Sequence, residues 1–294
     1  SGGSEDTGDV TINSAAEITA NDVTIDTSNG TGGSVDFNST VNSTTTNQAL
    51  TINSGGGAVA IDDVIGGHAD DHLDGLSIIA SSGAGTITLA AIGANAEAGV
   101  DGGNVAIGNN ATTTVTLSGA DYNANGTITV KATSGENIKF TAGALVEVKT
   151  ADDNITFSNA AIHLADATDL TVKSEGGAID IASIMSVADK DTDVILDADR
   201  AAGDVGGETV TIGAVGSGNE IAALTITGPD GITLKGDITL SNKAGSDLDI
   251  NGAVTIDGSV TIDTDNASAE RSGSTVHQDG DINFSSTIDG NGGT

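Results

Sequence analysis

The sequence predicts an all-β protein that is wound into a parallel right-handed β-helix, that is, a β-solenoid. Three observations predict this fold: short apolar–x–apolar triplets recur along the whole chain, Gly, Asn and Asp are frequent between them, and aromatic residues are scarce. Side chains alternate across a strand, so each triplet directs two apolar groups to one face and its middle residue to the other. Stacked coils need only small aliphatic side chains to fill a narrow interior.

Twenty-five such triplets occur in 294 residues, roughly one in every 12, and none of the intervening segments has a competing helical period. The middle residue is most often Thr, which favours strands and carries a polar tip for the outer face. With two or three strands per coil, the chain should form roughly 8–12 coils in one continuous domain, residues 1–294. Right-handed winding is expected of parallel crossovers. In order, the triplets are Val10–Ile12, Val23–Ile25, Val35–Phe37, Leu50–Ile52, Val59–Ile61, Leu76–Ile78, Ile87–Leu89, Val105–Ile107, Val115–Leu117, Ile128–Val130, Ile138–Phe140, Val146–Val148, Ile155–Phe157, Ile162–Leu164, Leu170–Val172, Ile179–Ile181, Val194–Leu196, Val210–Ile212, Leu224–Ile226, Ile232–Leu234, Ile238–Leu240, Leu248–Ile250, Val254–Ile256, Val260–Ile262 and Ile282–Phe284.

An array of β-sandwiches is the alternative fold, because short strands at this spacing also fit one. A sandwich of this length normally contains Trp or Tyr in its core and more prolines in its loops, whereas this chain has no Trp, one Tyr and one Pro. The phenylalanines Phe37, Phe140, Phe157 and Phe284 are expected to plug the solenoid core.

The composition excludes several classes of function. Lys plus Arg number 9 and Asp plus Glu number 42, which gives a formal charge of −33. Such a chain should repel nucleic acid and anionic membranes, since both require clustered positive charge. The absence of cysteine excludes disulfides, zinc–thiolate sites and thiol catalysis. No apolar run reaches the length of a membrane helix, so we expect no membrane insertion.

The two ends of the chain resemble each other in sequence. VTIDT at 23–27 recurs at 260–264, and VDFNSTVN at 35–42 is echoed by INFSSTID at 282–289. Two explanations fit: the chain is a slice of a longer tandem array, or it is a protomer with similar coils at both ends.

Both explanations leave unpaired backbone at the ends of the solenoid. The sequence shows no amphipathic capping helix at either end, and natural solenoids normally cover these edges. We therefore expect copies of the chain to assemble head to tail through the first and last coils. The expected self-assembly residues are Val10, Ile12, Ile282 and Phe284.

Several segments resemble the repeats of very large bacterial surface exoproteins. They are GDVTIN at 8–13, ALTINSGGGAVAIDDVIGG at 49–67, LDGLSIIAS at 73–81 and GDINFSSTIDG at 280–290. These strings are similar to filamentous-haemagglutinin-type adhesins, whose repeats form a right-handed β-helix shaft. The resemblance implies an extracellular or cell-surface location and a shaft-like role, with other surface or matrix components as further partners. The secretion domain that such exoproteins carry near their N-terminus is not recognisable.

One acidic string has the spacing of a calcium site. Asp189, Asp191 and Asp193 alternate, and Asp197 and Asp199 follow, as oxygen ligands for a hard cation would. The string departs from the EF-hand pattern where that pattern has its Gly and its bidentate Glu. A solvated acidic turn is the alternative, and no cofactor other than calcium is expected.

A second acidic segment, residues 62–75, contains two histidines. His68 and His72 would share a face only in a helix, which Gly66 and Gly67 disfavour, so a mobile acidic loop is expected rather than a transition-metal site. His163, the middle residue of its triplet, is expected to be a surface histidine. The acidic residues of the segment are Asp62, Asp63, Asp70, Asp71 and Asp74.

The expected function is therefore structural, as a building block of an extracellular bacterial fibre or adhesin shaft, and not enzymatic. A secreted carbohydrate-active β-helix enzyme, either a polysaccharide lyase or a hydrolase, is the alternative. Only two arginines, Arg200 and Arg271, are present to clamp an acidic sugar, and aspartates are too numerous to identify a catalytic pair. Ice binding is disfavoured because the threonines occur singly between aliphatic residues.

Overall fold

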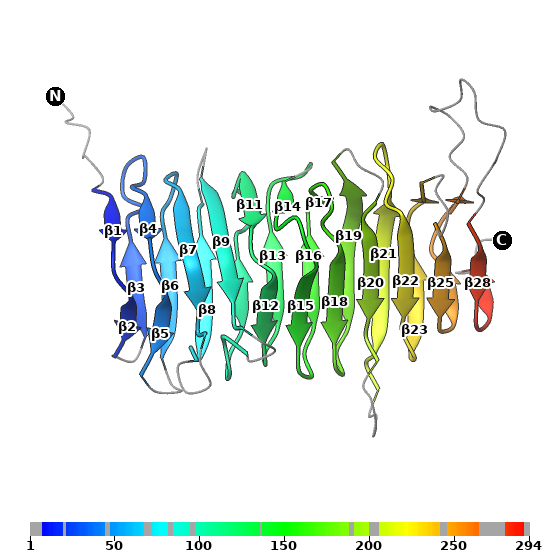
Figure 1. The fold of residues 1–294 in the computed structure, drawn as a ribbon, viewed down its shortest axis with the longest axis horizontal. Coiled ribbons are helices and arrows are strands. Elements are labelled where there is room, and N and C mark those ends of the chain that lie inside the picture. The colour runs from blue at the N-terminus through cyan, green and yellow to red at the C-terminus, as the bar shows by residue number, and fades with distance from the viewer. Residues whose placement is uncertain are drawn as a thin grey trace.

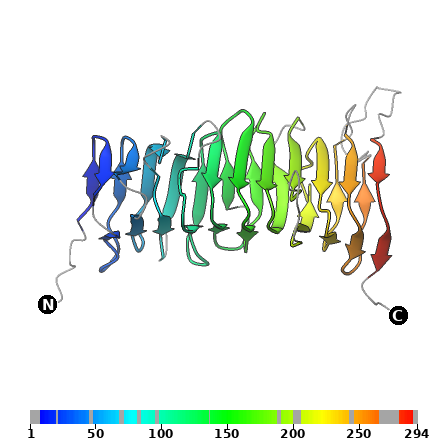
Figure 2. The same ribbon diagram turned by 90° about the horizontal axis from the view of Figure 1, so that it is seen from below.

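The computed structural model describes residues 8–19, 22–44, 48–67, 72–81, 85–94, 98–135, 137–187, 191–199, 206–241, 246–264 and 280–290. These residues form 29 strands and no helix of the length and apolarity that crossing a bilayer requires. The strands stack into one elongated rod with the two chain ends at opposite ends of it (Figures 1 and 2).

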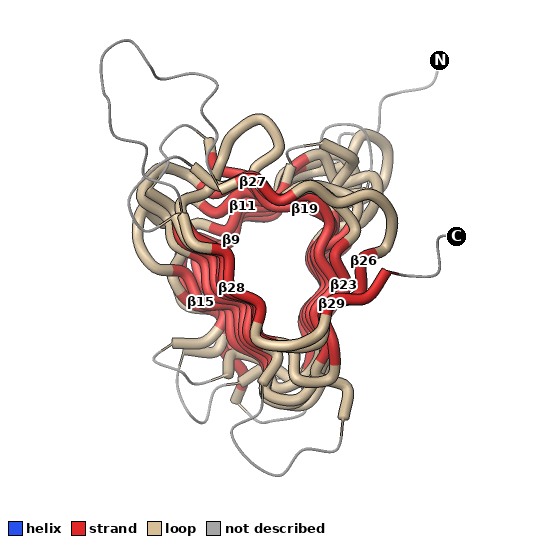
Figure 3. Tube along the Cα trace, turned by 90° about the vertical axis from the view of Figure 1, so that its right-hand side faces the viewer, coloured by secondary structure: helices blue, strands red, loops and turns tan. Residues whose placement is uncertain are grey.

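All strand pairings among the described residues are parallel, and each strand between the first and last coils pairs with strands of the preceding and following coils. The fold is therefore a parallel β-solenoid, and the sandwich alternative is wrong because sandwiches are built from antiparallel sheets. Viewed from the C-terminal end, the chain passes counter-clockwise as it approaches the viewer, which is right-handed winding (Figure 3). The predicted fold class is confirmed.

Each coil has three sides, so the cross-section is a triangle (Figure 3). Among the residues that the structure describes, each face contains eleven strand segments, within the predicted range of coils. The first face consists of β1 (Val10–Ile12), β4 (Val35–Phe37), the start of β7 (Val59–Ile65), the start of β9 (Thr86–Ile92), β11 (Thr114–Leu117), β14 (Ile138–Phe140), β17 (Ile162–Leu164), the end of β19 (Ile179–Ser186), the end of β21 (Thr209–Val215), β24 (Ile238–Thr239) and β27 (Ile262–Asp263). The second consists of β2 (Ala16–Ile18), β5 (Val41–Ser43), the ends of β7 and β9, β12 (Asp121–Ala124), β15 (Val146–Thr150), β18 (Leu170–Ser174), β20 (Asp193–Asp197), β22 (Ala223–Thr227), β25 (Leu248–Asn251) and β28 (Ile282–Phe284). The third consists of β3 (Val23–Asp26), β6 (Ala49–Asn53), β8 (Gly75–Ile79), β10 (Val105–Ile107), β13 (Ile128–Lys131), β16 (Ile155–Ser158), the starts of β19 and β21, β23 (Gly231–Leu234), β26 (Val254–Ile256) and β29 (Ile288–Gly290).

Like residues lie over like residues inside the rod. On the third face, for example, Ile128, Ile155 and Ile179 stack in register and are almost entirely buried. The outward residues also stack, so Thr129 lies beside Thr156. The triplet alternation of the sequence therefore corresponds to an aliphatic interior and a polar exterior.

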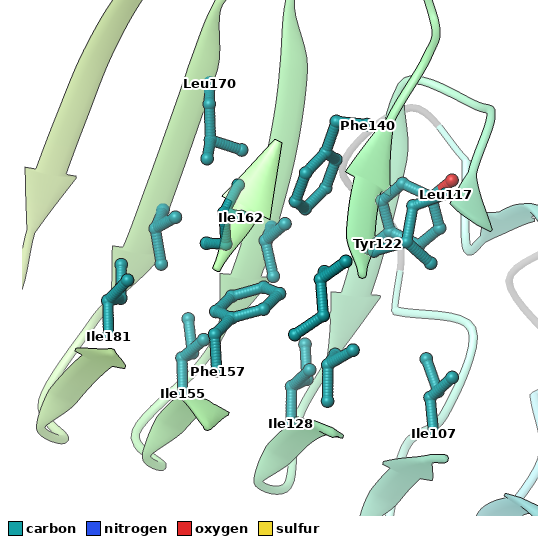
Figure 4. Close-up of a cluster of buried hydrophobic side chains, with 14 of the residues drawn as sticks. Ile107, Leu117, Tyr122, Ile128, Phe140, Ile155, Phe157, Ile162, Leu170 and Ile181 are labelled. Atoms are coloured by element: carbon teal, nitrogen blue, oxygen red, sulfur yellow. The ribbon is translucent and has the colours of Figure 1, made fainter. Parts of the chain in front are cut away.

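The core contains an aromatic cluster (Figure 4). The rings of Tyr122 and Phe140 meet edge to face at a centroid distance of 6.2 Å, and Phe140 lies 5.9 Å from Phe157. The Tyr122 hydroxyl donates to the carbonyls of Leu89 and Ala90 and accepts from the Gly119 N–H, while burial raises its pKa above the usual value. Phe140 and Phe157 are fully buried core plugs as predicted, and so is Phe37 near the N-terminal end.

Candidate functional site

The N-terminal end of the rod is an open sheet edge on all three faces. Among the described residues, β1, β2 and β3 pair only with β4, β5 and β6 of the second coil. The predicted assembly residues Val10 and Ile12 lie in β1, half-buried and packed against the core. This edge also includes Ala16 and Val23, which begin the second-face and third-face ladders.

The C-terminal end is also open, and its apolar side chains are more exposed. Ile282 is 44% exposed, Ile288 is 50% exposed and Phe284 is half-buried, whereas Leu248 of the preceding coil is fully buried. Within the part of the chain that the structure describes, strand β28 pairs only with β25, and β29 only with β26. The predicted residues Ile282 and Phe284 thus lie on the second face, while Val10 and Ile12 lie on the first face at the opposite end.

The sequence likeness of the two ends is offset by one face of the triangle. VTIDT begins on the third face at β3 and recurs at β27 on the first face, and the VDFNSTVN segment moves from the first and second faces to the second and third. The two ends are therefore alike in sequence but not in rotational position. The repeated motif alone does not determine how two ends would meet.

A recurrent side-chain hydrogen bond joins successive coils. An Asp or Asn at or just before a strand start accepts the backbone N–H at the equivalent position of the next coil. We call this contact the coil clamp. In six pairs it runs from a side chain of one coil to an N–H of the following, more C-terminal coil, whereas the Asp230 carboxylate accepts the Gly207 and Glu208 N–H groups of the preceding coil. The pairs, with oxygen–nitrogen distances, are Asp9–Ser34 (2.8 Å), Asn104–Thr127 (3.3 Å), Asn154–Ala178 (2.8 Å), Asp169–Asp193 (2.9 Å), Asp237–Thr261 (2.7 Å) and Asp247–Asp281 (2.9 Å).

The calcium candidate falls partly on this clamp. Asp189 lies outside the described residues, and Asp191 and Asp193 lie at the start of β20. The Asp193 carboxylate accepts the N–H of Ala223 in the next coil, and burial together with the nearby Asp169 carboxylate raises its pKa. The neighbour Asp169, 24 residues earlier, is one that sequence spacing did not identify.

The rest of the acidic string does not converge on the same point. The Asp197 carboxylate accepts the N–H of Asp199 at 3.0 Å, which is a local turn contact. Within the described ranges no three His, Asp or Glu side chains are grouped closely enough to hold a metal ion. The geometry of the described residues is that of coil-to-coil hydrogen bonding.

The start of the second acidic segment, residues 62–65, forms part of a strand and not the predicted loop. Asp62 and Asp63 lie within β7, where a register irregularity lets the strand turn from the first face to the second. The Nδ1 atom of His72 lies 3.9 Å from a carboxylate oxygen of Asp101 in the next coil. His68, Asp70 and Asp71 lie outside the described residues, and Asp74 is only half-buried.

The prediction that His163 is a surface histidine is wrong. His163 points outward from β17 but is only 7% exposed, because it stacks between Lys139 and Met185 of the adjacent coils. Together with Ala165 and Val187, His163 and Lys139 line a cavity of about 240 Å³.

A cluster of opposite charges lies on the second face. The Lys149 amine is 3.0 Å and the Lys173 amine 3.6 Å from the Glu175 carboxylate. Burial opposes ionisation of Glu175, but the two lysines outweigh it and lower the pKa. The two cations are therefore engaged with a carboxylate of the rod itself.

The comparisons with known proteins add no family to this description. No protein-family model, curated protein or solved structure that was compared with the chain matches it. The functional proposal therefore depends on the solenoid and its two open ends.

Proposed function

We propose that the chain is a structural segment of an extracellular fibre or adhesin shaft that lengthens by head-to-tail continuation of the β-solenoid. The observation that supports this most is the pair of open edges, each with partly exposed apolar side chains and parallel strands lacking a described partner on one side. Such an edge is a template for further strands. A contact between two different ends does not close on itself, so it propagates into a filament.

The surface of the rod is consistent with a shaft. Outward positions carry Thr, Asn and Asp, and the chain has no cysteine and a charge of −33. Like charges on the sides of neighbouring rods disfavour lateral association, while the apolar ends favour axial contact. The extracellular location, and a bacterial surface as its setting, rest on the resemblance of the repeats to adhesin shafts.

Lysine substitutions at the two ends test this proposal. Ile12→Lys and Phe284→Lys each place a charge on an inward position of a terminal coil, so either should abolish end-to-end association while the rod stays folded. Thr11→Lys and Asn283→Lys are matched controls, because they lie next to these residues but point outward. Sedimentation equilibrium measures association and circular dichroism measures folding. Equal association of the inward and outward variants would contradict the proposal, as would a monomer that cleaves an acidic polysaccharide.

A further inference from the structure

Each end of the solenoid is a ramp rather than a flat surface. The first coil runs through β1, β2 and β3, and the last through β27, β28 and β29, always from the first face to the second and third. The chain rises by one strand spacing, about 4.8 Å, in each turn. Successive faces at one end therefore differ in height by roughly a third of that spacing, and a single step separates the third face from the first.

Two such ramps fit each other in one rotational setting. When β27 lies on β1, β28 on β2 and β29 on β3, all three faces meet at the same spacing. If one copy is rotated by one face, two faces meet and the third stays apart by a further 4.8 Å or so, the width of a missing strand. The backbone groups on that face would then lack partners beside an open apolar core.

We infer that a second copy of this chain docks in that single setting, with β27 of one copy on β1 of the next, β28 on β2 and β29 on β3. This inference rests on the proposed head-to-tail function and specifies its joint. Extending the ladders by one level places Ile262 against Val10 and Ile288 against Val23. It also places Phe284, the bulkiest inward side chain of β28, against the small Ala16.

The outward charges favour the same setting. In it, Asp263 lies beside Thr11 and Asp289 beside Thr24, so the acidic residues of one copy stack on threonines of the other. In either rotated setting, β2 receives β27 or β29, which places Asp263 or Asp289 opposite Glu17. Like charges directly opposite each other on paired strands are destabilising.

Cysteine pairs test the setting directly, because the chain has no cysteine of its own. Copies with Thr24→Cys mixed with copies with Asp289→Cys should form a disulfide, since stacked residues on adjacent strands lie within the required Cα distance. Thr11→Cys with Asp263→Cys should do the same. Thr24→Cys with Asp263→Cys is the control, because these residues meet only in a rotated setting. All four positions are exposed and outward-facing.

The outcomes separate the joint from the function. Selective cross-linking of the first two pairs supports the inference. Equal or preferential cross-linking of the control pair, or association without cross-linking of the first two pairs, would overturn the setting while leaving head-to-tail assembly intact. Absence of association in the unmodified chain by sedimentation would overturn both.

Discussion

At the scale of single residues, the adjacent coils determine which hydrogen bonds a side chain makes. Asp193 stands in a string with calcium-site spacing, yet its N–H donates to Asp169 and its carboxylate accepts from Ala223. The sequence did not reveal these partners because coil lengths vary: Asp169 and Asp193 are 24 residues apart, whereas Asp247 and Asp281 are 34 apart. Sequence spacing therefore predicts which residues begin strands, but not which of them stack.

The raised pKa of Asp193 makes its contribution to stability depend on pH. Its pKa in the folded chain exceeds the unfolded value of about 3.9, so the folded state binds the proton more tightly. The stabilisation associated with this group is present below about pH 4 and is lost as the pH rises through the folded pKa. Asp193→Asn keeps an oxygen for the Ala223 N–H and removes the repulsion with Asp169. It should stabilise the rod at pH 7 by less than about 1 kcal/mol, since the group is partly exposed.

Thermal unfolding at pH 3.5 and pH 7, with and without calcium, measures this effect. Asp199→Asn is the matched control, because Asp199 belongs to the same string but is not a clamp residue. A calcium-dependent stabilisation of the unmodified chain that Asp193→Asn abolishes would instead identify a cation site.

At the scale of elements, the triplets predicted most strands but not all of them. Strands β5 and β29 lack the apolar–x–apolar pattern, and β2 and β12 have it only with Ala at one apolar position. All four form because the adjacent coils supply partners in register. Conversely, the triplet Val260–Ile262 was predicted to be a strand, but strand β27 begins only at Ile262. Pairing with the preceding coil begins there, where Ile262 pairs with Ile238. Inter-coil hydrogen bonding therefore overrides local pattern at the margins of a strand.

The strand register can be tested on β16. Ile155 is fully buried between Ile128 and Ile179, while its neighbour Thr156 faces outward. Ile155→Asn places an amide without hydrogen-bond partners in the core and should destabilise the rod by at least about 3 kcal/mol. Thr156→Asn should change stability by less than about 0.5 kcal/mol, as a surface substitution does. Equal midpoints of urea unfolding for the two variants would show that the assigned register is wrong.

At the scale of the whole molecule, the solenoid has a uniform interior and differs mainly at its ends. The composition predicted the narrow aliphatic core, and the absence of Trp disfavoured the sandwich alternative. The offset of the end repeats by one face could not be predicted, because it depends on the number of strand segments between them and not on the residue count. The same winding makes each end a ramp, which is why rotational position matters for any axial contact.

The most direct test of the central claim is negative-stain electron microscopy of the unmodified chain over a range of concentrations. At about 0.15 M salt, where charges farther apart than roughly 8 Å are screened, fibres of one constant width should lengthen as concentration rises. Their lengths should be multiples of a unit of roughly 50 Å, which is the height of the stacked strands. Single rods at every concentration, or growth by sideways bundling, would contradict head-to-tail assembly.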